Sequence, residues 1–270
     1  VRKITDLGMT DYNYSMFESM IKCPHGVILV TGPTGSGKTT TLYAALGELA
    51  KPNVNVITVE DPVEKNIDGV NQVQVNSKAG LTFASGLRSI LRQDPDIVMI
   101  GEIRDGETAE TAIRAAITGH LVLSTLHTND AASTIVRLCD MGVAPYLVAT
   151  SLIGVVAQRL VKLLCPDCKK ERMSTVVENE LMDIDHSVKI YDACGCPKCN
   201  NTGYKSRTAI HEIIISTSEM ASLIATSGTV EQISALAKKN GTKLLRDNVA
   251  GLVMDGTTTM DELVKTTFSV

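Results

Sequence analysis

The 270-residue sequence has no tryptophan and few other aromatic residues, with three phenylalanines and six tyrosines. Proteins that bind single-stranded nucleic acid use aromatic side chains as stacking platforms for the bases, so this composition argues against a helicase-like activity. The formal net charge of −4 argues in the same direction, because binding to nucleic-acid phosphates needs clustered Lys and Arg. We therefore expect no nucleic-acid partner.

Long hydrophobic runs are also missing. The most apolar segment, residues 147–157, contains Thr150 and Ser151 and is followed by Gln158-Arg159. It is shorter than the roughly 18 residues that a membrane-spanning helix requires. We predict instead that it belongs to a buried helix over residues 145–164. The polar residues before Val27 do not have the pattern of a secretory signal.

An eight-residue segment, Gly32–Thr39, matches the pattern G-x-x-x-x-G-K-T. It lies between an apolar run, Val27–Val30, and a helix-forming sequence, which is the setting of a phosphate-binding loop (P-loop). In such loops glycines let backbone N–H groups turn toward the phosphates, so we expect Lys38 to reach the outer phosphates and the Thr39 hydroxyl to bind Mg²⁺. The segment predicts binding of ATP or GTP. The expected nucleotide-binding residues are Gly32, Pro33, Thr34, Gly35, Ser36, Gly37, Lys38, Thr39 and Thr40.

Short apolar segments rich in β-branched residues alternate with helical patterns from residue 25 to residue 164. This alternation predicts a mostly parallel sheet covered by helices on both faces. The predicted strands are Val27–Val30, Val54–Val59, Ile97–Ile100 and Leu121–Ser124. The predicted helices are Thr40–Ala50, Phe83–Gln93, Glu107–Thr118, Ala131–Gly142 and Pro145–Leu164, with a turn over Asp11–Ser15 and a short helix over Met16–Ile21 ahead of them.

Acidic residues follow two of these predicted strands. The carboxyl ends of parallel strands meet at one edge of a sheet, so Glu102, after Ile100 and Gly101, is expected beside the γ-phosphate as the catalytic acid/base. Glu60 and Asp61 follow the strand ending at Val59 and are expected to hold a cation or an attacking water, because clustered carboxylates otherwise repel one another. For Glu64, a solvated turn is an equally good interpretation.

Basic residues complete the predicted site. His127 follows the strand that begins at Leu121, where it can contact phosphate, and its polar neighbours favour a functional role. For His120, a structural role is an equally good interpretation. Phosphoryl transfer often uses an arginine from a neighbouring subunit, but the pattern of the sequence does not rank the arginines of this chain.

Four of the seven cysteines form two C-x₂-C pairs, Cys165–Cys168 and Cys196–Cys199, which are separated by 27 residues. Two such knuckles complete a closed tetrahedral site, for which zinc in a structural role is the expected ion. A nucleotide-binding loop indicates a compartment where thiols stay reduced, which disfavours a disulfide scaffold. Cys194 stays open as a competing ligand, and redox use of either pair is a weaker alternative.

Four segments together resemble the secretion ATPase superfamily, most closely its type II secretion and type IV pilus assembly motors. They are the P-loop, Val59–Glu64, Asp96–Asp105 and Gly119–Asn129. The resemblance covers almost the whole chain and implies a RecA-like P-loop NTPase core of the α/β class. It also implies that Arg88 and Arg207 approach the nucleotide phosphates. At His211, chains that resemble this one often have tyrosine.

The resemblance further implies a function: hydrolysis of ATP that powers pseudopilus or pilus assembly by a homo-hexameric ring. The ring is expected in the cytoplasm, peripheral on the inner membrane through platform and cytoplasmic adaptor proteins. The tetracysteine element favours assembly over retraction, with a retraction motor or a nucleic-acid translocase of the same superfamily as alternatives. The expected cofactors are ATP, Mg²⁺ and Zn²⁺.

From the residue patterns along the sequence, we expect the chain to have four parts. These are a lead-in over residues 1–24, the RecA-like core over 25–164, the tetracysteine element over 165–204 and a helical subdomain over 205–270. Because related chains carry further domains ahead of the motor, one of which supplies arginines across the ring, we expect the sequence to be a fragment whose site is incomplete by itself.

Overall fold

The computed structural model describes residues 2–268, which form two compact units. The first unit consists of residues up to 158 together with 212–242, and the second of residues 159–211 together with those from 243 onward. Two long strands, β6 (Leu152–Leu164) and β9 (Tyr204–Ile215), run from one unit into the other. The four-part division expected from the sequence stays a prediction, and the two units follow different boundaries.

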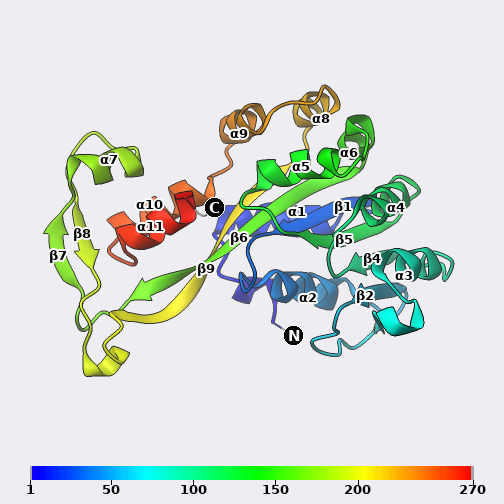
Figure 1. Cartoon of the computed structure of the whole chain (residues 1–270), viewed down its shortest axis with the longest axis horizontal. Coiled ribbons are helices and arrows are strands. Elements are labelled where there is room, and N and C mark those ends of the chain that lie inside the picture. The colour runs from blue at the N-terminus through cyan, green and yellow to red at the C-terminus, as the bar shows by residue number, and fades with distance from the viewer. Residues whose placement is uncertain (1, 269–270) are drawn as a thin grey trace. The chain divides into compact units, whose positions relative to one another are not determined.

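The first unit contains a mostly parallel sheet and the P-loop (Figure 1). The sheet has the strand order β3-β2-β4-β5-β1-β6-β9, and the neighbouring strands from β3 to β6 pair in parallel. Its remaining strands are β1 (Gly26–Thr31), β2 (Val56–Glu60), β3 (Val70–Gln74), β4 (Ile97–Ile100) and β5 (Leu121–Leu126). The helices of this unit are α1 (Asp11–Ile21), α2 (Lys38–Leu49), α3 (Phe83–Ile90), α4 (Gly106–Ile117), α5 (Ala131–Asp140), α6 (Pro145–Ser151), α8 (Ser218–Ala225) and α9 (Val230–Lys239), with short 3₁₀ turns at Ile4–Asp6 and Ser77–Ala79.

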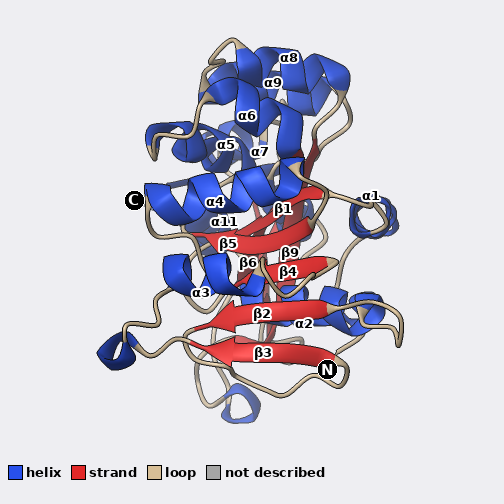
Figure 2. Ribbon diagram, turned by 90° about the vertical axis from the view of Figure 1, so that its right-hand side faces the viewer, coloured by secondary structure: helices blue, strands red, loops and turns tan. Residues whose placement is uncertain are grey.

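Helices cover both faces of this sheet, as Figure 2 shows. Successive strand residues face opposite sides, and on β1 the side chains of Ile28 and Val30 join a core cluster with Phe17 of α1 and Leu42 of α2. The opposite face of β1 packs against α4, which also contacts α3. The predicted α/β fold, with four of its strands at the expected places, is confirmed.

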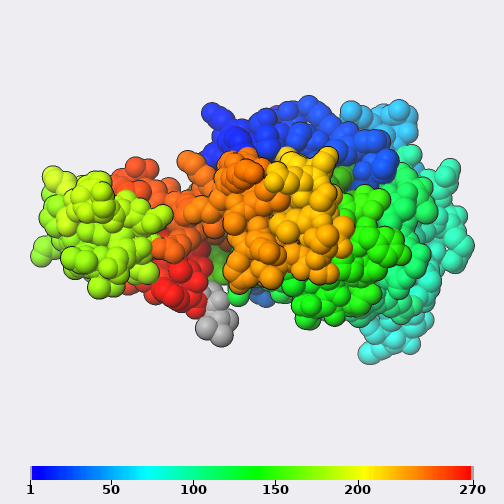
Figure 3. Space-filling view, turned by 90° about the horizontal axis from the view of Figure 1, so that it is seen from above, coloured from blue at the N-terminus to red at the C-terminus, as the bar shows by residue number. Residues whose placement is uncertain are grey.

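Helices α5, α6, α8 and α9 form a group at one end of this unit. Helix α8 contacts α6, and α9 contacts α5. In Figure 3 the yellow-to-orange segment of α8 and α9 lies against the green segment of α5 and α6. A capping box at Thr229 and Gln232 starts α9, as its sequence pattern indicates.

The prediction of a helix over residues 145–164 is wrong after Ser151. There α6 ends and the chain continues as β6, which pairs in parallel with β1. Periodicity does not separate a buried strand from a buried helix in a continuous apolar run, and here the open edge of β1 decides for the strand. The burial expected for this run is confirmed at Val155, Val156 and Ala157.

Other local assignments also differ from the expectation. Residues 11–15 do not form a turn, because Thr10 accepts a hydrogen bond from the Asn13 N–H and starts α1 there. Strand β3 and the long strand β9 have no predicted counterpart. Strand β9 begins among polar residues (Tyr204–Arg207), and β3 mixes polar residues with two valines. Strand formation there depends on neighbouring strands.

The second unit is smaller and has its own elements. Strands β7 (Lys170–Met173) and β8 (Lys189–Asp192) form an antiparallel pair. Helices α7 (Val176–Met182), α10 (Leu245–Met254) and α11 (Met260–Phe268) and the 3₁₀ turn Pro197–Cys199 complete it. Among residues 2–268, no helix is both long and apolar enough to cross a membrane.

Two glycines provide a matched test of this packing. A Cβ on Gly154 of β6 would lie 2.6 Å from the carbonyl oxygen of Ile214, whereas a Cβ on Gly251 of α10 meets nothing within 4 Å. We expect Gly154→Ala to lower the free energy of unfolding by about 1–3 kcal/mol through overpacking. Gly251→Ala should raise it by up to about 1 kcal/mol through helix propensity. Urea unfolding followed by circular dichroism measures both, and equal effects of the two variants would contradict the β6 packing.

Candidate functional site: a P-loop cavity and a tetracysteine cluster

The P-loop connects the carboxyl end of β1 to α2, which begins at Lys38. Gly37 precedes the helix with a φ of 89°, a conformation that suits glycine. A Cβ on Gly32 would lie only 2.2 Å from the carbonyl oxygen of Gln158, so no larger residue fits there without a shift. Because α2 begins directly after the loop, its first N–H groups and its positive end face the loop. This is the arrangement that binds phosphate.

A cavity of about 380 Å³ lies beside this loop. Its wall includes acidic and basic side chains from the ends of three strands, together with the P-loop. The residues expected from the sequence that line it are Thr34, Gly35, Gly37, Lys38, Thr39, Thr40, Glu60, Asp61, Glu102 and His127. The structure therefore brings together the predicted carboxylates, His127 and most of the P-loop around one space. Gly32, Pro33 and Ser36 belong to the loop but are not part of the wall.

Lys38 lies within the curve of the loop. Its Nζ donates to the carbonyl oxygens of Gly32, at 2.8 Å, and Pro33, at 3.1 Å. Burial lowers the pKa of Lys38, and the nearby charge of Glu102 partly opposes this shift. The ammonium group is thus held at the cavity, where it can contact an anionic ligand.

Glu102 lies between two basic side chains. One carboxylate oxygen accepts a hydrogen bond from the Arg104 guanidinium, and the other lies 3.2 Å from Nε2 of His127. Burial alone would raise the pKa of Glu102, but the contacts with Arg104 and His127 bring it below its ordinary value. Arg104 also lies 3.9 Å from a carboxylate oxygen of Asp61 and covers the ring of Phe83. Glu102 is therefore held in its ionised form at neutral pH.

Glu60 has a different environment because neutral groups hold it. Its side chain is buried and accepts hydrogen bonds from the Tyr43 hydroxyl, from Thr58 Oγ1 at 2.6 Å and from Gln72 Nε2 at 3.0 Å. Burial and the contact with Glu60 raise the pKa of Tyr43 to about 12. The Tyr43 hydroxyl also accepts the N–H of Glu64 at 3.1 Å. This network fixes the direction of the Glu60 carboxyl group beside the cavity.

Two of the three partners of Glu60 carry no signal in the sequence. Tyr43, Thr58 and Gln72 belong to α2, β2 and β3. Thr58 is the one whose position could be inferred, because it lies two residues before Glu60 and thus on the same face of β2. The other two reach Glu60 only through the tertiary fold.

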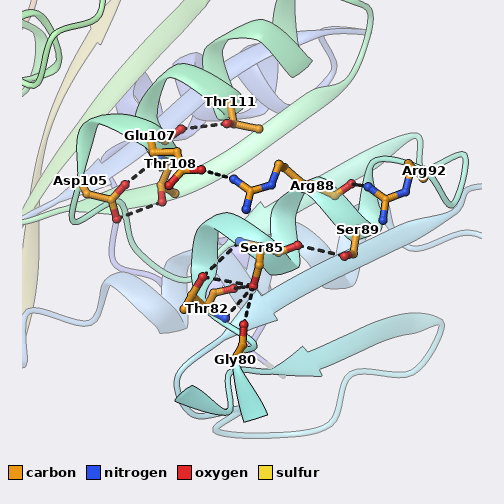
Figure 4. A network of polar contacts seen from close by, with 10 residues as sticks. All are labelled: Gly80, Thr82, Ser85, Arg88, Ser89, Arg92, Asp105, Glu107, Thr108 and Thr111. Carbon is orange, nitrogen blue, oxygen red and sulfur yellow. Dashed lines mark hydrogen bonds and ion pairs between the residues drawn. The ribbon is translucent and has the colours of Figure 1, made fainter. Parts of the chain in front are cut away.

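Arg88 and Arg207 do not line the cavity. Arg88 of α3 forms an ion pair with Glu107 near the start of α4, and its carbonyl oxygen accepts from Arg92 at 2.9 Å (Figure 4). Arg207 lies in the second unit, on the exposed first part of β9. Contact of either arginine with a nucleotide stays a prediction.

The four cysteines of the two C-x₂-C pairs form one cluster in the second unit. All four sulfur atoms lie within 4.8 Å of one another, and the Cys165–Cys196 and Cys168–Cys199 sulfurs are each 3.9 Å apart. Four thiolates bound tetrahedrally at about 2.3 Å from a zinc ion would lie about 3.8 Å from one another. The cluster therefore fits the four-cysteine site of a zinc ion. Cys194 is exposed and is not a member of it.

Backbone N–H groups support this cluster. Cys168 Sγ accepts the N–H of Gly195 at 3.3 Å, and Cys199 Sγ accepts the N–H groups of Cys196 and Gly203, each at 3.2 Å. Such donors favour thiolates, the form in which cysteine binds a metal. When bound, zinc would be held by all four cysteines and would have no open position for a substrate.

We expect the chain to contain about one zinc ion, measured by elemental analysis after purification without added metal. A Cys165→Ser/Cys196→Ser variant should lose it, whereas Cys194→Ser should retain it because this side chain lies outside the cluster. Less than about half an equivalent in the unmodified chain would contradict the assignment.

The Glu102 environment gives a second prediction. Because Arg104 lowers the pKa of Glu102, the carboxylate should stay ionised as the pH falls through its ordinary range. Arg104→Met should move the protonation midpoint of Glu102 upward, which ¹³C NMR of the labelled carboxyl group can measure. Arg114→Met is the control, because Arg114 pairs with Glu110 on the surface of α4. An unchanged midpoint in Arg104→Met would show that this ion pair does not set the pKa.

The chain is similar to known secretion proteins over nearly all of its length. A family model described as "Type II/IV secretion system protein" matches residues 1–265. Type II secretion system ATPase E of Vibrio cholerae is 51% identical over 97% of this chain and 52% of its own length. Type IV pilus assembly ATPase PilB of Thermus thermophilus is 45% identical over 99% of this chain and 30% of its own length. The chain thus spans about half the length, or less, of these curated relatives.

A solved structure has the same fold. The pilus retraction motor PilT, crystallised with bound ADP, superposes with a TM-score of 0.75 at 28% sequence identity, covering 98% of this chain and 67% of that one. The match covers the unit that contains the P-loop. The resemblance indicated by the four sequence segments is confirmed. The chain therefore belongs to the type II/IV secretion system protein family.

Proposed function

We propose that this chain is the motor part of an ATPase that powers pseudopilus assembly in a type II secretion system. The observation that carries the proposal is the P-loop cavity, whose wall contains Lys38, Thr39, Glu60, Glu102 and His127. The ADP bound to the PilT relative and the names of the relatives that are 45–51% identical support the same function.

Each polar group of the cavity has a role in this proposal. Lys38 and the first N–H groups of α2 bind the outer phosphates, and Thr39 would hold Mg²⁺, which would neutralise phosphate charge. Glu60 and Asp61 would help to hold this ion or the attacking water. The donors of these three hydrogen bonds to the Glu60 side chain are neutral groups, which favours a position of this carboxylate near Mg²⁺.

Glu102 is the acid/base group. The oxygen of a water molecule attacks the γ-phosphorus, the bond from that phosphorus to the bridging oxygen breaks, and Glu102 accepts the proton of the water. Its lowered pKa keeps the carboxylate ionised, which is the form that can accept a proton. His127 and Arg104 hold the two carboxylate oxygens and so orient the group.

The larger assembly is part of the same proposal. We expect a homo-hexameric ring at the cytoplasmic face of the inner membrane, bound to platform and adaptor proteins and independent of nucleic acid. Arg88 and Arg207 are both exposed, a position from which an arginine can serve a neighbouring subunit in a ring. The tetracysteine cluster and the higher identity to secretion and assembly ATPases than to PilT favour assembly over retraction.

Two variants separate binding from hydrolysis. Lys38→Ala should weaken ATP binding by about tenfold or more, because a charge-assisted contact to phosphate is lost. Glu102→Gln should bind ATP normally but release phosphate about 10²–10⁴-fold more slowly, the usual loss when a general base is removed. Fluorescent-nucleotide titration and a coupled phosphate assay measure the two effects.

The matched control is Arg114→Gln, a change on the exposed face of α4 that should leave both properties unchanged. If the unmodified chain binds no nucleotide, the proposed function is wrong. If it hydrolyses ATP and Glu102→Gln does so equally fast, the acid/base role of Glu102 is wrong.

A further inference from the structure

Gln158 connects the P-loop to strand β6 through its side chain. It is 3% exposed. Its Nε2 donates to the carbonyl oxygen of Ser36 at 2.6 Å, and its Oε1 accepts the Thr41 hydroxyl at 2.6 Å. One carboxamide thus holds the loop and the first turns of α2 together, and both of its polar ends have partners in the buried interior.

The orientation of this carboxamide follows from its partners. The Ser36 carbonyl can only accept a hydrogen bond, so the NH₂ group must face it, and the hydroxyl of Thr41 then donates to the remaining oxygen. Glutamine is the residue that supplies a donor and an acceptor on one planar group. A glutamate at position 158 would place an oxygen against the Ser36 carbonyl oxygen.

The backbone around Gln158 is also close to the loop. A Cβ on Gly37 would lie 2.8 Å from Gln158 Nε2, and a Cβ on Gly32 would lie 2.2 Å from the Gln158 carbonyl oxygen. The closeness of Gln158 thus leaves no space for a side chain at either of these two loop positions. Strand β6 reaches this place because it pairs with β1 in parallel, with Ala157 beside Thr31.

This contact bears on phosphate binding through the geometry of one peptide bond. In a trans peptide unit the C=O and the following N–H point in opposite directions. When Gln158 binds the Ser36 carbonyl, the N–H of Gly37 is turned to the other side of the loop, and Gly37 lines the cavity. Loop N–H groups directed at a ligand are what a phosphate site requires.

We propose that Gln158 is a positioning residue, which acts through the P-loop by fixing the Ser36–Gly37 peptide unit in its phosphate-binding orientation. The inference rests on the proposed function in taking nucleotide phosphate as the ligand of this loop. It adds that phosphate binding depends on a side chain of β6, a strand that contributes no residue to the wall of the cavity. Because β6 runs from Gln158 directly into the second unit, the residue that orients the loop is also the one where the chain leaves the first unit.

The test uses two changes at Gln158. Gln158→Met keeps the volume but removes both hydrogen bonds, and Gln158→Glu keeps an acceptor for Thr41 but loses the donor to Ser36. We expect both to weaken binding of a fluorescent ATP analogue by about tenfold or more, as the loss of a buried hydrogen bond does. Amide hydrogen exchange over residues 32–38, without nucleotide, should become faster in both variants.

Thr41, which donates its hydroxyl to the Gln158 carboxamide, allows an independent pair of variants. Thr41→Val removes the hydroxyl that orients the carboxamide, so we expect faster amide exchange of the loop. Thr41→Ser keeps a hydroxyl and should behave as the unmodified chain. Gln93→Met, at an exposed position in the turn that follows α3, is the control for loss of a glutamine. Exchange over β4 and the zinc content report whether each variant remains folded.

The outcomes separate this inference from the proposed function. If the unmodified chain binds no nucleotide, the proposed function fails, and the exchange of residues 32–38 still decides whether Gln158 positions the loop. If Gln158→Met binds nucleotide as the unmodified chain does and its loop exchange is unchanged, the inference is wrong. If a Gln158 variant does not fold, Thr41→Val against Thr41→Ser decides, and equal exchange in these two would overturn the proposal.

Discussion

The parallel pairing of β1 with β5 and β6, and of β4 with β2 and β5, is the constraint on which the site depends. Every residue of β1, β2, β4 and β5 is buried, so the backbone of these strands must satisfy its hydrogen bonds within the sheet. Parallel strands have their carboxyl ends at one edge. The P-loop, Glu60, Glu102 and His127 therefore meet there although they are far apart in the sequence.

The two acidic residues at this edge have contrasting surroundings. Glu60 is held by the hydroxyl groups of Tyr43 and Thr58 and by an amide, whereas Glu102 lies against Arg104 and His127. The contacts with Arg104 and His127 lower the pKa of Glu102, whereas the donors around Glu60 are neutral groups. The sequence already predicts different roles for these two carboxylates, and the structure gives them different neighbours.

The two units use different means of stabilisation. The first has a large apolar cluster that includes Phe17, Met20 and Leu46. The second has short strands, the ion pairs of Arg172 with Glu178 and Asp192, and the tetracysteine cluster. Small units with little apolar core commonly depend on a bound metal or cross-link. A zinc ion held by all four cysteines would join the two C-x₂-C pairs, which are 27 residues apart in the sequence, within the second unit.

The sequence by itself determined the features that depend on neighbouring residues. The P-loop pattern, the short β-branched strands and the two C-x₂-C pairs each have a local physical cause, namely close backbone approach to a ligand, burial on both faces of a sheet and tetrahedral metal geometry. The family followed from the order of these segments. Tertiary structure alone decided that residues 152–164 form a strand, because an apolar run takes its conformation from the partner that satisfies its backbone. It also decided that Tyr43 holds Glu60 and that Gln158 holds Ser36, since a hydrogen bond between residues distant in the chain exists only after the sheet has brought them together.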